Sequence, residues 1–224
     1  MMAARRMVIL VEGESELVFV QKMLIPELYK FCKGDWSIET CKIISNRKLH
    51  KKGGNINYDY LCNDVARFVS QGCCVITTFL DFFRLPNNFP GYTTDATRIY
   101  EMESAMEKDM RNLVPDLQMF IPYIQKHEFE ALLFSSMDGF DYLLDDREPL
   151  QRIQEIINAY PNPEDINGGK SSAPSKRLLD IFNYNKAADS VDMLEIIGFD
   201  VIYSKCPKFA AWYDCLKKII SDVS

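Results

Sequence analysis

The stretch RMVILVEGESELVFVQKMLIPELY, residues 6–29, decides the fold. After Arg6, residues 7–11 are continuously apolar, which predicts a buried strand, and residues 17–29 carry apolar side chains at helical spacing. Glu12 and Gly13 follow the strand at a point typical of a tight turn. The stretch is therefore expected to form a strand, a turn and a helix, the unit from which parallel α/β sheets are built.

The same alternation continues along the first part of the chain. The run CCVITTFL, residues 73–80, is apolar or threonine throughout, which suits a strand buried on both faces of a parallel sheet. Pro122 weakens a later strand and favours an edge position or an irregular end. The other segments expected here are strands at residues 37–44 and 118–124 and helices near residues 61–69 and 97–112.

Beyond His127 the pattern changes to helices alone. We expect an α/β fold in which a mainly parallel sheet of about four strands is flanked by helices. Residues 1–135 would form this core, and residues 136–224 a helical C-terminal region packed on or beside it. The helices expected after the core lie at residues 128–134, 139–144, 150–160, 175–182, 191–197 and 207–220.

Composition limits the classes of protein to which the chain can belong. The chain has 224 residues and a formal net charge of -6, and 47% of its residues are hydrophobic, as in soluble globular proteins. No apolar run approaches the roughly 20 residues that a membrane span needs, so a cytoplasmic protein is expected. The seven cysteines are an odd number without a CxxC motif, which indicates neither a disulfide framework nor a thiolate zinc site.

Acidic residues follow three of the four predicted strands, and a basic segment follows the remaining one, the strand at residues 37–44. Because the carboxyl ends of parallel strands meet at one edge of a sheet, these side chains are expected to gather there. Carboxylates brought together need a cation, and hard oxygen ligands suit Mg²⁺ or Mn²⁺. The acidic group with its histidine comprises Glu12, Glu14, Glu16, Asp81, His127, Glu128 and Glu130, and the basic segment holds Arg47, Lys48, Lys51 and Lys52.

Each of these residues also has a structural interpretation. Glu14 and Glu16 lie where the helix dipole favours acids, and Asp81 is typical of a residue that caps a helix or turn. His127 alone is more often a packed or capping residue than a catalyst, and basic runs are usually solvated. The coincidence of all of them at one sheet edge favours a joint site.

Longer strings add a resemblance to a known family. The turn VEGESE (residues 11–16), Asp81 and the later acidic pair resemble the TOPRIM domain of topoisomerases, primases and overcoming-lysogenization-defect nucleases. Nearly the whole chain looks like a prokaryotic TOPRIM-like family of uncharacterised function. The strings that carry this closer resemblance are TFLDFFRLP (78–86), FPG (89–91), HEFEALLFS (127–135), NPEDIN (162–167) and APSKRL (173–178).

The resemblance implies roles for particular residues. Glu12 and Glu16 match the two glutamates of the TOPRIM pattern, and Asp81 matches the first aspartate of its DxD motif. Phe83 stands where the second aspartate is expected, so one metal ion is as well supported as two. Glu128 and Glu130 match the acidic pair that nucleases of this class use for a second metal.

The leading hypothesis is a Mg²⁺- or Mn²⁺-dependent phosphodiesterase, a nuclease of a defence or DNA-processing system. Its DNA or RNA substrate is left open. The metal ligands would be Glu12, Glu16, Asp81 and Glu130, and the catalytic residues Glu12, Asp81, His127 and Glu128. Contacts to the phosphate backbone would come from Arg47, Lys48, Lys51, Lys52, Lys176 and Arg177.

Two alternatives stay open. Loss of the acid at Phe83 favours a catalytically weak or inactive effector subunit that works with a partner ATPase. Phosphoryl or nucleotidyl transfer on a small nucleotide would need a base pocket, for which Phe82, Phe83 and Tyr92 are candidates. The net charge of -6 opposes binding to nucleic acid, yet residues 42–52 hold five of the 26 basic residues and no acid.

Overall fold

A computed structural model of the chain divides into two compact units. Unit 1 comprises residues 1–124 and 217–224, and unit 2 comprises residues 125–216. The division precedes the expected boundary at residue 135, and the last residues of the chain return to unit 1. The structure describes residues 5–46, 51–52, 56–73, 75–83, 85–166 and 172–222, without the side chains of residues 45, 46, 51 and 52. Within these ranges, no helix has the length and apolarity that crossing a membrane requires.

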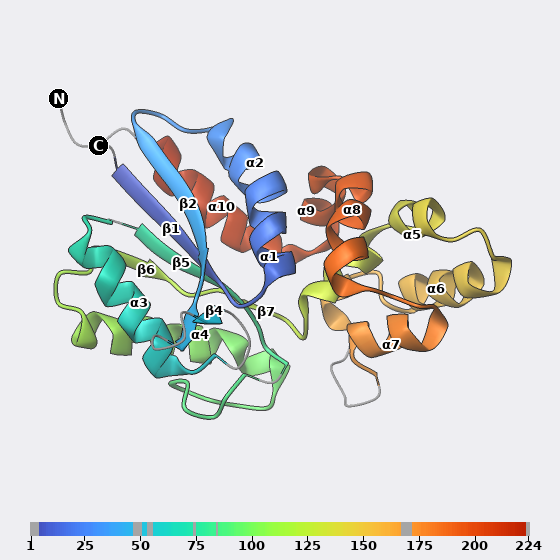
Figure 1. Cartoon of the computed structure of the whole chain (residues 1–224), viewed down its shortest axis with the longest axis horizontal. Helices are drawn as coiled ribbons and strands as arrows, with labels where there is room; N and C mark the ends of the chain where they lie inside the picture. Colours follow the sequence, from blue (N-terminus) through green and yellow to red (C-terminus); the bar gives the residue numbers. More distant parts are fainter. Residues whose placement is uncertain are drawn as a thin grey trace. The chain divides into compact units, whose positions relative to one another are not determined.

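Unit 1 is built on a mainly parallel sheet, which confirms the expected α/β class (Figure 1). In the described part of the chain this sheet has five strands, in the order β2-β1-β5-β6, with β7 paired to β5 off this path. β1 pairs in parallel with both β2 and β5, and β5 pairs in parallel with β6. The strands are β1 (Arg5–Val11), β2 (Trp36–Lys42), β5 (Val75–Asp81), β6 (Met119–Ile121) and β7 (Ile124–Gln125).

The helical connection after β1 has three parts in direct succession, α1 (Glu14–Phe19), the π-helical segment η1 (Val20–Leu24) and α2 (Ile25–Tyr29). Pro26 lies in the first turn of α2. Because proline lacks an N–H and clashes with the carbonyl four residues earlier, the preceding turn widens, and this accounts for the π-helical segment.

The part of the chain after β2 contains two short strands that the sequence did not predict. β3 (Ile44–Asn46) and β4 (Lys51–Lys52) pair antiparallel as a separate two-stranded sheet. The chain then enters α3 (Tyr58–Ser70), whose N-cap Asn57 accepts a hydrogen bond from the backbone N–H of Tyr60.

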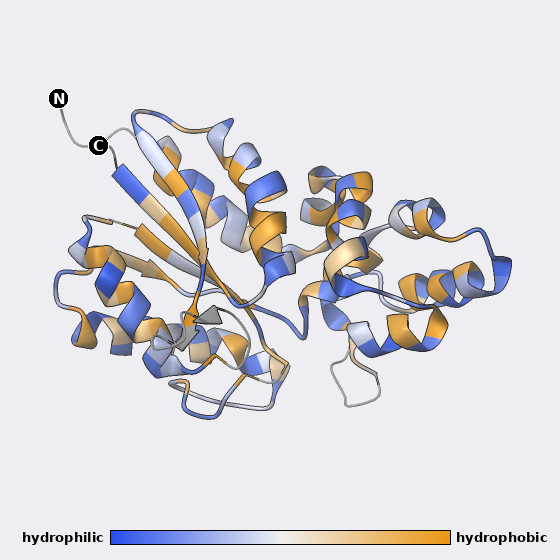
Figure 2. Ribbon diagram, in the orientation of Figure 1, coloured by the Kyte–Doolittle hydropathy of each residue, from blue (hydrophilic) through white to orange (hydrophobic). Residues whose placement is uncertain are grey.

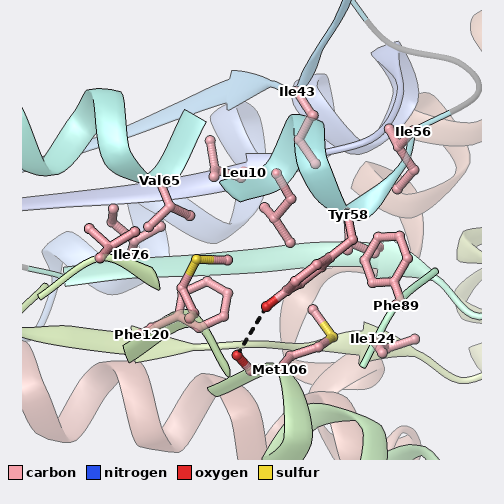
Figure 3. Close-up of a cluster of buried hydrophobic side chains, with 14 of the residues drawn as sticks. Leu10, Ile43, Ile56, Tyr58, Val65, Ile76, Phe89, Met106, Phe120 and Ile124 are labelled. Carbon is pink, nitrogen blue, oxygen red and sulfur yellow. Dashed lines mark hydrogen bonds between the residues drawn. The ribbon is translucent and has the colours of Figure 1, made fainter. Parts of the chain in front are cut away.

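The core of unit 1 lies between the sheet and two helices, α3 and α4 (Ile99–Leu113). Val8, Leu10 and Ile76 point to this face of the sheet and are fully buried among the apolar faces of both helices. Tyr58 crosses the interior, and its hydroxyl donates to the backbone carbonyl of Met106 at 3.5 Å (Figure 3). Colouring by hydropathy shows β1 changing from hydrophilic at its start to hydrophobic along the remainder (Figure 2).

The opposite face of the sheet is covered by α1, η1 and α2 (Figure 1). The ring of Phe19 in α1 packs against Phe79 of β5 at 5.9 Å between centroids, and Phe79 packs in turn against Tyr123. Residues of β1 and β5 thus alternate between two buried faces, which is why their sequences are continuously apolar.

Pro122 interrupts the last strand, as its sequence predicts, and separates β6 from β7. Two buried threonine hydroxyls of β5 compensate for the interrupted ladder. Thr77 donates to the carbonyl of Ile121 at 2.6 Å, while Thr78 donates to the carbonyl of Tyr123 and accepts from its N–H.

Unit 2 is helical. Its α-helices are α5 (Asp138–Leu143), α6 (Arg147–Ala159), α7 (Pro174–Ile181), α8 (Lys186–Ile197), α9 (Phe199–Lys205) and the larger part of α10 (Pro207–Ser221), with the 3-10 segments η3 (Phe129–Ser135) and η4 (Pro163–Asp165). The carboxylate of Glu164 is almost fully buried and accepts hydrogen bonds from the N–H groups of Lys208 and Phe209 in the first turn of α10. Glu164 therefore caps this helix from a distant part of the sequence.

Candidate active site

The strand order creates a switch point in the sheet. From β1 the chain moves to β2 on one side and later to β5 on the other, so the connections diverge between β1 and β5. In open α/β sheets the crevice at such a point, beyond the carboxyl ends of the strands, is where ligands bind. The strand order thus makes the carboxyl ends of β1 and β5 the expected ligand-binding edge of the sheet.

Two predicted site residues lie at these two strand ends. Glu12 directly follows β1 and Asp81 is the last residue of β5. Val11 is paired with Phe79, and neighbouring strands lie about 4.8 Å apart. The structure therefore brings Glu12 and Asp81 to the same edge of adjacent strands, and both side chains are half-buried there.

Glu16 lies one helical turn after Glu12 and is buried, with 3% of its surface exposed. Its carboxylate lies against Gly13, so closely that a Cβ atom on Gly13 would be 2.4 Å from Oε2. A side chain at position 13 would therefore have to displace the carboxylate of Glu16. Glu16 is held beside the same strand end as Glu12.

Lys42 is a cation at this edge that sequence reasoning did not select as a site residue. It ends β2, is paired in the sheet with Val11, and forms an ion pair with Glu14. Its side chain is 23% exposed, whereas Glu14 is 60% exposed. Three adjacent strand ends therefore carry acids and one lysine, an arrangement suited to a phosphate ester held beside a divalent cation.

The donor set fits Mg²⁺ chemically, since carboxylates are its preferred protein ligands. Among the described residues, no group of three or more His, Cys, Asp and Glu side chains is arranged to hold a metal ion. Mg²⁺ in phosphoryl-transfer sites commonly uses one or two carboxylates together with waters and substrate phosphates. Glu12 and Asp81 satisfy that smaller requirement.

His127 lies in unit 2 and has an unusual backbone. Its φ of 68° falls in the left-handed region, which is uncommon for a residue other than glycine. Burial lowers the pKa of His127 to about 4; the charge of Lys126 adds to this effect and that of Asp165 opposes it. His127 is therefore neutral at pH 7 and able to accept a proton but not to donate one as imidazolium.

Glu128 and Glu130 have described partners inside unit 2. Glu128 accepts hydrogen bonds from the N–H and the hydroxyl of Ser175, at 2.9 and 3.1 Å, in the first turn of α7. Glu130 is 2% exposed and forms an ion pair with Lys186 at 3.3 Å. These contacts give both acids structural roles, and their catalytic and metal-binding roles stay predictions.

The basic residues divide into two groups. Arg47 and Lys48 lie outside the described residues, and Lys51 and Lys52 form β4 without described side chains. Lys176 and Arg177 lie on α7 in unit 2.

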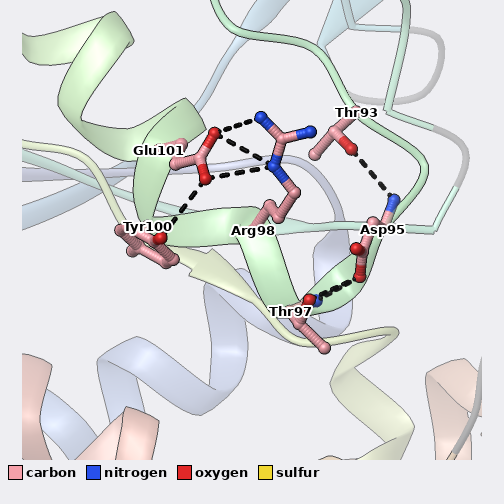
Figure 4. Close-up of polar contacts among 6 residues, drawn as sticks. All are labelled: Thr93, Asp95, Thr97, Arg98, Tyr100 and Glu101. Atoms are coloured by element: carbon pink, nitrogen blue, oxygen red, sulfur yellow. Dashed lines mark hydrogen bonds and ion pairs between the residues drawn. The ribbon is translucent and has the colours of Figure 1, made fainter.

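The loop between β5 and α4 ends in a polar network that fixes the start of the helix (Figure 4). Asp95 accepts hydrogen bonds from the N–H and hydroxyl of Thr97, and these bonds lower its pKa. Arg98 pairs with Glu101 at 2.5 Å, so its charge is already engaged at the surface.

Phe82, a candidate for a base pocket, packs against the core of unit 1.

Comparison with known proteins bears on the family. The model of a domain of unknown function, DUF4276, matches residues 11–217. The chain belongs to the DUF4276 family. Searches among curated proteins and among solved structures gave no match. The matched region begins at Val11, directly before Glu12, and spans all the candidate residues of this DUF4276 chain.

A further residue of the DUF4276 domain escaped sequence reasoning. Asp64 in α3 is 1% exposed; it accepts a hydrogen bond from the N–H of Ile44 at 2.8 Å and pairs with Arg67 at 3.0 Å. It thereby ties α3 to β3, the strand that leads into the basic segment. The sequence signal for Asp64 is its position at helical spacing from two apolar residues, Leu61 and Phe68.

Proposed function

We propose that this DUF4276 chain is a metal-dependent phosphodiesterase, a nuclease with a TOPRIM-like carboxylate site at the carboxyl ends of β1 and β5. The observation that supports it is the position of Glu12 and Asp81 at the switch point of a parallel sheet. Glu16 is the third acid of the site. Work in the reducing cytoplasm is part of this proposal, because a buried thiol such as that of Cys206 stays reduced there.

Each residue has a distinct task in the proposed reaction. Glu12 and Asp81 would hold Mg²⁺ or Mn²⁺, and Glu16 would add a third carboxylate at the β1–α1 turn beside them. A bound divalent cation supplies activation of a water and compensation of the charge that develops on the phosphate. When the substrate enters, Lys42 releases Glu14 and pairs with a phosphate oxygen. The side chain of Glu14 is largely exposed, so it can move away into solvent.

The direct test is cleavage of DNA and RNA strands with Mg²⁺ or Mn²⁺ by the wild type, Glu12→Gln and Asp81→Asn. A matched control is Asp35→Asn, because Asp35 is an exposed acid that precedes β2, at the opposite end of the same sheet. The proposal predicts cleavage by the wild type and by the control only. Equal activity in all four proteins would mean that the cleavage does not come from this site.

A second candidate function is favoured by Phe83, which stands where the second aspartate of a DxD motif is expected. In this version the domain is a TOPRIM-like effector subunit of weak or no activity that works with a partner ATPase. Phe83→Asp discriminates between the two versions. A gain of cleavage in this variant, with none in the wild type, would support the effector role.

A further inference from the structure

Unit 2 contains a groove between α6 and α7, and none of the residues that line it belongs to the carboxylate site. Its volume is about 710 Å³, within the range of roughly 300–1,000 Å³ typical of sites for small ligands. The residues that matter here are Arg152, Tyr160, Ser172, Lys176, Arg177 and Asp180. They belong to the two helices and to the residues that flank them.

One side of the groove is cationic, and contacts within the protein hold its arginine in place. The guanidinium of Arg177 donates from Nε to the carbonyl of Ser172 at 2.7 Å and lies over the ring of Tyr160, 5.5 Å from its centroid. These two contacts orient Arg177 before any ligand arrives. A fixed guanidinium fork beside an aromatic ring is a common arrangement for recognising phosphate and a flat base together.

The remaining charges leave this side positive. Arg152 pairs with Asp180 at 2.5 Å, so these two groups neutralise each other. Glu155 also lines the groove and keeps its negative charge, because its hydrogen bond comes from the neutral amide of Gln151. Lys176 forms no ion pair with any other residue that the structure describes, and it adds a cation next to Arg177 in the same groove.

We propose that this groove binds a nucleotide, either free or within a single strand of nucleic acid, with Lys176 and Arg177 on the phosphate and Tyr160 beside the base. The inference rests on the proposed function because it names a holding site for the same class of substrate. It adds a base-stacking contact that the carboxylate site does not supply. A single strand offers both chemical features, whereas the stacked bases of a duplex are hidden from Tyr160.

Binding is measured by fluorescence anisotropy with labelled DNA and RNA strands of about 12 nucleotides, in EDTA so that no cleavage takes place. Lys176→Ala and Tyr160→Leu should each weaken binding about tenfold, and Lys176→Ala should also lower the salt dependence by about one phosphate contact. Lys205→Ala removes an exposed lysine of α9 in the same unit and should bind as the wild type does. Arg177→Lys keeps the charge but loses the stacked fork, so it should weaken binding less than Lys176→Ala does.

Competition separates the two sources of the ligand. Displacement of the strand by a mononucleotide at similar concentration assigns the groove to free nucleotides, and displacement only by unlabelled strands assigns it to nucleic acid. Folding of each variant is checked by circular dichroism. Equal binding by Lys176→Ala, Tyr160→Leu and Lys205→Ala, or tighter binding of a duplex than of a strand, would overturn the inference.

The same titration separates this inference from the proposed function. Glu12→Gln and Asp81→Asn should not weaken binding in EDTA, because neither residue lines the groove. A chain that binds strands through the groove but never cleaves them would refute the nuclease and leave the groove intact.

Discussion

Gly13 and Glu16 share one small space at the end of β1, where a Cβ atom on Gly13 would be 2.4 Å from Oε2 of Glu16. Cβ atoms essentially never approach another heavy atom this closely, so a side chain at position 13 must displace the carboxylate. Glu16 is 3% exposed and has little room to move. The shape of the β1–α1 turn is therefore coupled to the position of an acid at the sheet edge.

This coupling predicts the effect of Gly13→Ala. The displaced carboxylate of Glu16 should lower the affinity for Mn²⁺ about tenfold, the lower end of the effect of disturbing groups that orient metal ligands. Calorimetric titration measures it. Glu16→Gln should have a similar effect, and the double variant should be no worse than either single one, because both changes act on the same group. Independent, additive losses would contradict the coupling.

Lys42→Ala should slow strand cleavage by about 100-fold, the typical effect of removing one group that stabilises developing negative charge. Its affinity for Mn²⁺ should not fall, because the change removes a positive charge from beside Glu14. Single-turnover rates and calorimetry measure the two effects. Lys108→Ala, at an exposed position of α4, is the matched control. A loss of metal affinity equal to the loss of rate would assign Lys42 a structural role.

His127 should stay neutral through most of the acidic range. Its folded pKa of about 4 lies below the ordinary value of 6.5, so the unfolded chain binds more protons between these two values. His127 therefore contributes stability that is fully present above pH 6.5 and is lost as the pH falls towards 4. NMR titration reports this pKa directly, because the chain has only two histidines.

His127→Asn assigns the signal and keeps the left-handed backbone, which asparagine tolerates better than most residues. The variant should show a smaller loss of stability than the wild type when urea unfolding at pH 7 is compared with pH 5. A His127 signal that titrates near pH 6.5 would contradict the effect of burial.

Glu128→Ala should destabilise the fold by about 1–2 kcal/mol, because it leaves the N–H and hydroxyl of Ser175 without their acceptor at the start of α7. Urea unfolding measures the change. Glu148→Ala removes an exposed acid in the first turn of α6 and serves as the control. A Glu128→Ala variant of wild-type stability that has lost cleavage would instead favour the catalytic role predicted from the sequence.

Much of the architecture was predictable because it depends on local patterns. The continuous apolar runs of β1 and β5 identified buried parallel strands, and Pro122 identified the interrupted edge. The pairing of β3 with β4 was not predicted, since residues 43–52 show no alternation. The helix α9 also escaped prediction, because it follows α8 after the single residue Gly198, whose φ of 85° redirects the chain.

The candidate site was predictable only in part. Glu12 and Asp81 were selected because each directly follows or ends a recognisable strand, and the structure places both at adjacent strand ends. The pair of Lys42 with Glu14 depends on the register between β1 and β2, and the role of Asp64 depends on a distant backbone N–H. Such long-range contacts leave little trace in one sequence.

Anomalous diffraction from crystals soaked in Mn²⁺ tests the central claim most directly, because it locates the metal. The account predicts a peak beside the carboxylates of Glu12 and Asp81, and its loss in Asp81→Asn crystals soaked in the same way. Crystals of the wild type without a peak at the ends of β1 and β5, or an unchanged peak in Asp81→Asn, would contradict it.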